Sequence, residues 1–297
     1  MSFTAISDIV NPEVLADQVS AKFPDMLWIG NTNLVAVDTT FPEGSPGTVL
    51  TIPFWKRIGG FALKAETAAM TPGNITTGKE RAQWARAGAA YEVYDTAELV
   101  SKADPVGEIA SQIARRAAEW IDAALLTEAN LTPNTYDASA AVIDQNTFIT
   151  ALVNTLGDNH GKMLNGGAII MHSKVYGDLL KTAAIQNQYQ SGMDILKTGN
   201  TAFLLGMPVL VSDLVTTTAA SGSTPAYYES YIVGPEALAL FYQRKVMVEF
   251  DRDILLQADV IAATVHYAAH LFGYDDVGGT VVAEQNKSIH LVAVKSR

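Results

Sequence analysis

Two histidines stand at positions that could bind a metal ion. His266 and His270 are four residues apart, so on a helix they would share one face and could hold one ion together. The metalloprotease pattern requires Glu directly after the first histidine, but Tyr267 follows His266. Apolar residues occupy the odd positions from 261 to 271, which predicts a strand. On a strand the two side chains would lie roughly 13 Å apart, and we therefore interpret both as ordinary surface histidines.

Other patterns associated with catalysis or ligand binding are incomplete. In Gly157–Lys162 the glycines are one residue too close for a phosphate-binding loop, and Met163 stands where Ser or Thr should contact magnesium. The spacing of Asp251, Asp253 and Asp259 does not match a calcium loop and indicates a solvated acidic turn. The chain has neither a Gly-x-Ser-x-Gly elbow nor a dinucleotide fingerprint. We predict no catalytic, cofactor-binding or metal-binding residues.

Composition narrows the range of functions. The 297 residues are 48% apolar, enough for one large domain or two ordinary ones. The net charge of −11, from 20 basic and 31 acidic residues, argues against a surface that grips nucleic acid. Cysteine is absent, so neither disulfides nor thiolate sites can form. The first residues lack the pattern of a signal peptide, and no stretch is long enough to span a membrane. We expect the protein to be made and kept in a cytoplasm.

A long helix is predicted over residues 104–129. Asp104 is a suitable N-cap, and Pro105 fits the first helical position. At 1.5 Å per residue the helix would span roughly 36 Å. A stripe of apolar residues is spaced by three and four, and should face the core: Val106, Ile109, Ile113, Ala117, Trp120 and Ala124.

We expect two segments before this helix to form no hydrophobic core of their own. Residues 1 to about 45 contain one short helix, from Asn11 to Lys22, and otherwise resemble an extended arm that must lie on its own subunit or a neighbour. Residues 47–95 predict a long hairpin, with a first strand through Phe54 and a return limb from Glu80 to Asp95. Such a hairpin is marginally stable alone.

The rest of the chain alternates helices and strands, with no internal repeat. A helix is expected over 144–156 and another from Ser173. Strands are expected at 167–171, 207–212, 226–233, 237–250 and 288–294, although 237–250 could also begin as a helix.

In this order, the segments resemble the major capsid proteins of tailed bacteriophages with the Hong Kong 97-type fold. The resemblance covers nearly the whole chain. It rests on ISDIVNPEVLADQV, GTVLTIPFWKRIGG, DPVGEIASQIARRAAEWIDAALL, GAIIMHSKVYGDLLK, LLGMPVLVSD and FDRDILLQADVIAATVHYAAHLFG. It implies an α+β fold whose arm and extended loop reach neighbouring subunits. The implied divisions are an N-terminal arm (1–46), an extended loop (47–95), a peripheral domain with the spine helix (96–160), an axial domain (161–236) and peripheral strands with a C-terminal strand (237–297).

The resemblance implies a coat protein, not an enzyme, that assembles through hexamers and pentamers into an icosahedral shell around double-stranded DNA. It implies location in the virion capsid after assembly in the bacterial cytoplasm. The implied partners are a separate scaffolding protein, a portal, possible decoration proteins and weakly contacted DNA, without membrane or cofactor. An encapsulin compartment and an uncharacterised enzyme are the alternatives. Some relatives crosslink a loop lysine, but we interpret Lys56, Lys64 and Lys79 as ordinary surface lysines.

Overall fold

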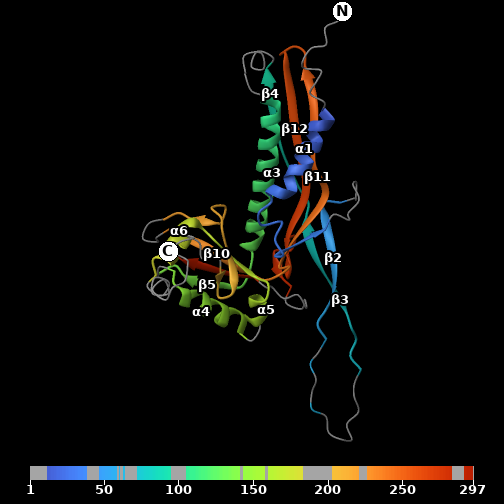
Figure 1. Ribbon diagram of the computed structural model, residues 1–297. Helices are drawn as coiled ribbons and strands as arrows, with labels where there is room; N and C mark the ends of the chain where they lie inside the picture. The colour runs from blue at the N-terminus through green and yellow to red at the C-terminus, as the bar shows by residue number, and fades with distance from the viewer. Residues whose placement is uncertain are drawn as a thin grey trace, which may run out of the picture.

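The computed structural model describes residues 12–38, 47–58, 60, 63, 72–94, 105–140, 143–157, 160–182, 203–220, 226–282 and 291–296. Figure 1 shows a long sheet and a long helix running side by side, a second sheet with its helices beside one end of them, and a hairpin that projects beyond that end. The predicted α+β class is confirmed.

The long sheet has the strand order β1-β11-β12-β4. Its centre is the antiparallel pair β11 (Leu238–Asp253) and β12 (Ala258–Leu271), which confirms the strand predicted over 259–271 and excludes a helix at 237–250. The edges come from far earlier in the chain. Strand β1 (Val35–Asp38) runs parallel to β11, and β4 (Ala85–Tyr94) runs antiparallel to β12.

Helix α3 (Pro105–Ala129) is the predicted long helix, and α1 (Pro12–Met26) packs against it and against β11. The proposed N-cap Asp104 lies outside the described residues. The buried side of α3 includes Ala110, Ile113, Ala114, Ala118, Ile121 and Leu125. The predicted stripe was therefore wrong at Trp120, which is 58% exposed. Each residue turns about 100° around a helix, so Trp120 lies to one side of the buried Ile121.

Residues 12–38, which fall in the proposed arm, form part of a core that they share with later segments. Val19 and Phe23 of α1, followed by Ile29, Leu34 and Val35, lie in the same core as α3 and the long sheet. These apolar residues were expected to lie on their own subunit or on a neighbouring one, and those named here lie on their own subunit. The remaining parts of the proposed arm, 1–11 and 39–46, lie outside the described residues.

The second sheet has the order β5-β15-β10-β6-β8-β7, with β9 paired to β10. Its strands are β5 (Thr135–Ala138), β6 (Ala168–Met171), β7 (Phe203–Leu204), β8 (Met207–Val211), β9 (Thr217–Thr218), β10 (Tyr227–Val233) and β15 (Leu291–Ser296). The helices that share a core with it are α4 (Gln145–Leu156), α5 (His160–Leu164) and α6 (Ser173–Leu180). Alternate residues of β6 belong to this core and to the α3 core, which explains its fully apolar sequence.

The projecting hairpin consists of β2 (Val49–Trp55) and β3 (Thr77–Gln83), paired from Val49–Gln83 to Trp55–Thr77. The predicted return limb is not one strand, because it divides at Trp84 and its second half, β4, joins the long sheet. Ala82 of β3 packs with Ala239, Phe241 and Ala268 in a small core at the base of the hairpin. A two-residue pair of strands, β13 (Tyr274–Asp275) and β14 (Thr280–Val281), lies next to β3.

Candidate functional site

His270 lies at the base of the hairpin and is completely buried, so its interpretation as a surface histidine was wrong. Its Nδ1 lies 2.9 Å from Asp276 Oδ2, and its Nε2 lies 3.2 Å from Glu80 Oε2. Burial alone would lower the pKa of His270, but the hydrogen bonds and charges of Asp276 and Glu80 raise this pKa to about 9. The imidazolium form donates both N–H groups to carboxylates. Because neither ring nitrogen keeps a free lone pair, His270 cannot bind a metal ion in this arrangement.

Glu128, near the end of α3, brings a third carboxyl group to this place. Burial, followed by the charge of Asp276, raises the pKa of Glu128 to about 7, and His270 opposes this shift. Within the described residues, Glu128 Oε2 and Asp276 Oδ1 are buried without a hydrogen-bond partner. We call Glu80, Glu128, His270 and Asp276 the hairpin-root cluster. It joins β3, α3, the end of β12 and the segment after β13.

Further polar contacts hold β3 beside the cluster. The second carboxylate oxygen of Glu80, Oε1, accepts a hydrogen bond from Gly273 N at 3.1 Å. Arg81 donates from Nε and Nη2 to the carboxylate of Asp275, with the shortest contact at 2.7 Å. This Arg81 contact lowers the pKa of Asp275. The base of the hairpin is therefore fixed to the body by hydrogen bonds and ion pairs from two adjacent residues of β3.

His266, the other histidine, has different surroundings. It is half-buried on β12, opposite Arg86 and Arg244 in the neighbouring strands. Burial and these two cations lower the pKa of His266, which favours the neutral ring. Among the described residues, no group of three or more His, Asp or Glu side chains is arranged to hold a metal ion.

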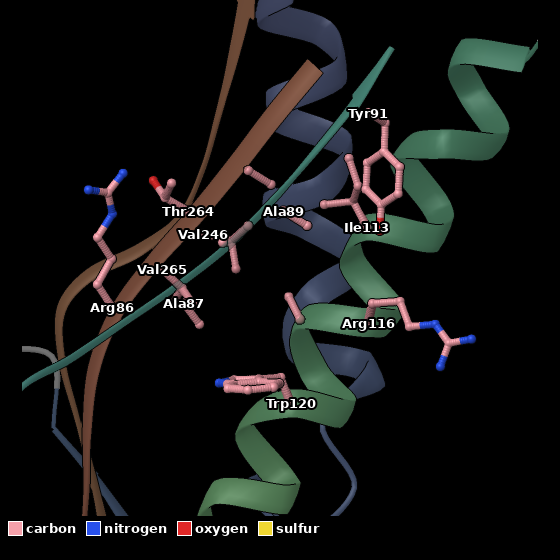
Figure 2. A pocket seen from close by; sticks show the side chains of 13 residues that line it. Arg86, Ala87, Ala89, Tyr91, Ile113, Arg116, Trp120, Val246, Thr264 and Val265 are labelled. Atoms are coloured by element: carbon pink, nitrogen blue, oxygen red, sulfur yellow. The ribbon is translucent and has the colours of Figure 1, made fainter. Parts of the chain in front are cut away.

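A groove of about 350 Å³ lies between α3 and the strands β4 and β12 (Figure 2). We call it the helix groove. Its lining is mainly apolar and includes Ala87, Tyr91, Ile113, Trp120 and Val265. Figure 2 shows the guanidinium groups of Arg86 and Arg116, also in the lining, pointing away from each other. The helix groove is therefore a mainly apolar surface that is open to the outside of the single subunit.

Trp120 is a large apolar residue in the lining of the helix groove. Its indole Nε1 donates a 2.8 Å hydrogen bond to the hydroxyl of Tyr267 on β12. Burial, and to a smaller extent the charge of Glu128, raises the pKa of this hydroxyl. Tyr267 therefore lies between the helix groove and the hairpin-root cluster.

The remaining candidates from the sequence form no common site. Asp253 Oδ1 accepts hydrogen bonds from the backbone of Leu255 and Leu256 in the turn between β11 and β12, and Arg252 pairs with Asp259 at 2.8 Å. The phosphate-loop candidate contains Gly157, with a φ of 51°, and the start of α5, but residues 158–159 lie outside the described residues.

The loop lysines differ in their surroundings. Lys79 is exposed on β3, Lys56 is half-buried, and Lys64 lies outside the described residues. No described helix combines the length and apolar character needed to cross a bilayer.

Sequence reasoning missed Glu80, Glu128 and Asp276 as partners of His270. One signal was available, because His270 lies within Ala268–Leu271, a run of otherwise apolar residues. A histidine in such a run requires buried hydrogen-bond partners. The sequence could not identify them, since Glu80 is 190 residues away.

The known proteins that this chain resembles in sequence are phage capsid proteins. A family model described as phage capsid protein matches residues 78–282. The major capsid protein of Bacillus phage SPP1 is 25% identical over 288 residues, which cover 91% of this chain and 86% of that protein.

Solved structures have the same fold. The head structure of Helicobacter pylori bacteriophage KHP40 has a TM-score of 0.67 at 11% identity, covering 88% of each chain. The capsid of Ralstonia phage GP4 also gives 0.67, at 8% identity, covering 90% of this chain and 88% of that one. With the family model matching more than half of the sequence, this chain belongs to the phage capsid protein family and is a coat protein of a tailed bacteriophage with the Hong Kong 97-type fold.

Proposed function

We propose that this coat protein closes into an icosahedral shell of hexamers and pentamers around double-stranded DNA, and that the β2–β3 hairpin makes contacts between subunits. The exposed apolar side chains of the hairpin support this proposal. Trp55 and Ile75, at its projecting end, are 67% and 64% exposed in the single subunit. Large apolar side chains on a projecting pair of strands favour contact with another chain.

The helix groove supplies a complementary surface on the body of the subunit. Trp120 and Tyr91 remain partly exposed there, beside the buried Ile113. In a closed shell every copy presents the same hairpin and the same groove. A small free energy from each contact is therefore repeated throughout the particle.

We propose the same division of the chain as the resemblance implies, with β4 forming the edge where the extended loop meets the peripheral sheet. The divisions are 1–46, 47–95, 96–160, 161–236 and 237–297. The net charge of −11 supports weak contact with packaged DNA, because few cations are available to neutralise phosphates. We also propose a separate scaffolding protein and a portal as assembly partners. The proposed role is structural, without catalysis.

A deletion tests the role of the hairpin. Residues 57–75 are replaced with a short Gly-Ser turn, which keeps β2, β3 and the hairpin-root cluster. We expect a subunit that melts cooperatively, as the wild type does, but sediments as small species under conditions in which the wild type forms particles. Thermal unfolding and sedimentation velocity measure the two properties. Normal particles would contradict the assembly role, and an unfolded product would place the deleted segment in the core.

A second test addresses catalysis. Purified particles are screened for hydrolase activity with and without added divalent metal ions. We expect no turnover above that of a preparation lacking the coat protein. A turnover that scales with particle concentration would contradict the purely structural role.

A further inference from the structure

We propose that the hairpin-root cluster is a proton-operated latch, in which loss of one proton loosens the attachment of the β2–β3 hairpin to the body of the subunit. Its members come from four parts of the chain: Glu80 from β3, Glu128 from α3, His270 from β12 and Asp276 from the segment after β13. The latch is a property of the single subunit, and its role in a shell rests on the proposed function.

The cluster holds more carboxyl groups than cations. His270 is the cation at the centre of the cluster, and both of its N–H groups donate to Asp276 and Glu80. Glu128 adds a third carboxyl group, whose pKa the charge of Asp276 raises and that of His270 lowers. While Glu128 carries a proton, one cation faces two anions. After that proton leaves, three carboxylates share one imidazolium in a buried place, where an uncompensated charge is unfavourable.

Two carboxylate oxygens of the cluster are buried without a hydrogen-bond donor in the described part of the chain. Glu128 Oε2 and Asp276 Oδ1 have no hydrogen-bond partner within the described residues, and the Asp276 charge acts on Glu128. A proton on the Glu128 carboxyl reduces the repulsion between these groups. Without it, the charges of Glu128 and Asp276 repel each other, and each group keeps a buried oxygen that no described donor contacts.

The charge of the cluster changes at neutral pH. The pKa of Glu128 is about 7, whereas His270, at about 9, stays protonated there. The other charged neighbours are Arg81 and Asp275, which neutralise each other in their own ion pair. Tyr267 faces Glu128 from β12, and its raised pKa keeps the hydroxyl protonated. The proton on Glu128 is thus the one that a change of pH near neutrality removes.

The hairpin is the element that should loosen. Its contact with the body includes a small core containing three alanines, together with partly buried side chains such as Leu50 and Ile52. Both carboxylate oxygens of Glu80 are bonded to the body, one to His270 and the other to Gly273 N. By contrast, α3, β11 and β12 share the large core. Among these elements, β3 is held to the body by the smaller apolar core, so repulsion in the cluster should loosen β3 first.

Hydrogen exchange tests the latch on unassembled full-length subunits. Amides of β3, residues 77–83, are followed from roughly pH 6 to pH 8, with rates corrected for intrinsic exchange. We expect protection to fall about tenfold as pH rises, with a midpoint near the pKa of Glu128. Glu128→Gln should keep the protection constant over this range. Glu108→Gln, an exposed position on the same helix, serves as the control and should behave as the wild type.

A second variant separates the latch from a merely structural role. Burial and then the charge of Asp276 raise the pKa of Glu128. Asp276→Asn removes that charge and leaves two carboxylates for one imidazolium, so the exchange transition should become smaller and its midpoint should move to lower pH. Constant wild-type protection, or a pH response retained in Glu128→Gln, would overturn the proposal. If Glu128→Gln does not fold, an unmoved midpoint in Asp276→Asn would overturn it. Particle formation is scored separately, since a wild type that never assembles contradicts the proposed function and not the latch.

Discussion

Replacing Asp122 with Ala should detach the N-terminal segment from α3. Asp122 is buried, and its carboxylate accepts three hydrogen bonds from consecutive backbone N–H groups after α1. Trp28 N lies 2.9 Å from Oδ2, while Ile29 N and Gly30 N lie 3.2 and 3.1 Å from Oδ1. These bonds connect the end of α1 to the middle of α3, across more than 90 residues of sequence.

The magnitude follows from the donors left behind. Each buried donor without an acceptor costs about 1–3 kcal/mol, and the N–H groups of Ile29 and Gly30 are buried. Removing the carboxylate also removes a buried charge. Burial makes that charge unfavourable and so raises the pKa of Asp122, although the three backbone hydrogen bonds oppose this shift. Subtracting this relief, we expect Asp122→Ala to lower the free energy of unfolding by about 3 kcal/mol.

Asp122→Asn is the matched control. An amide oxygen in the place of Oδ1 still accepts from Ile29 and Gly30, and only the bond from Trp28 is lost. The expected loss is about 1 kcal/mol. Urea unfolding of unassembled subunits, followed by far-ultraviolet circular dichroism, measures both variants. Equal losses for Ala and Asn, or a loss from Ala below about 1 kcal/mol, would refute the hydrogen-bond account.

Three other substitutions test the core, the long sheet and the cluster. Ile113→Asp should lower the free energy of unfolding by several kcal/mol and give insoluble protein, because Ile113 is buried against apolar side chains. The control Gln112→Asp, at an exposed neighbouring position, should stay soluble in a sedimentation assay. Gly88→Ala should lower the melting temperature and cost about 1–3 kcal/mol, because a Cβ there would lie 2.8 Å from Ala263 O on β12; an unchanged melting curve would show that β4 can shift freely. The raised pKa of His270 stabilises the folded state fully below pH 6.5, and this contribution disappears as pH rises through about 9. His270→Gln should therefore lower the free energy of unfolding by up to roughly 3 kcal/mol at pH 6 and by much less at pH 10. An equal loss at both pH values would exclude this charge effect.

Local sequence patterns predicted the elements whose partners are nearby or whose periodicity is strong. The alternation through Ile261 and Val265 gave the strand β12, and Pro105 marked the first residue of α3. The family resemblance predicted the fold and the role as a coat protein, and both are confirmed. The order of weak segments was more informative than any single motif.

Patterns failed where distant parts of the chain decide the environment. The exposure of Trp120 depends on which side of α3 the long sheet covers. The division at Trp84 depends on β12, which pairs with β4 and leaves β3 for β2. The buried charge of His270 requires a partner from β3, and no local periodicity encodes that contact. The divisions into arm, loop and domains stay a prediction.

The pairing of early strands with late ones has a consequence for synthesis. Val35 pairs with Leu238, Tyr94 with Ala258, and Thr135 with Ala293. Folding with such separated contacts is slow, and the usual progress from the N-terminus during translation is blocked. A chain that ends before residue 238 has no partner for β1 or β4, and it lacks His270 to hold the base of the hairpin. We expect incomplete translation products to be unable to present a native hairpin, so they would not be incorporated into a growing particle.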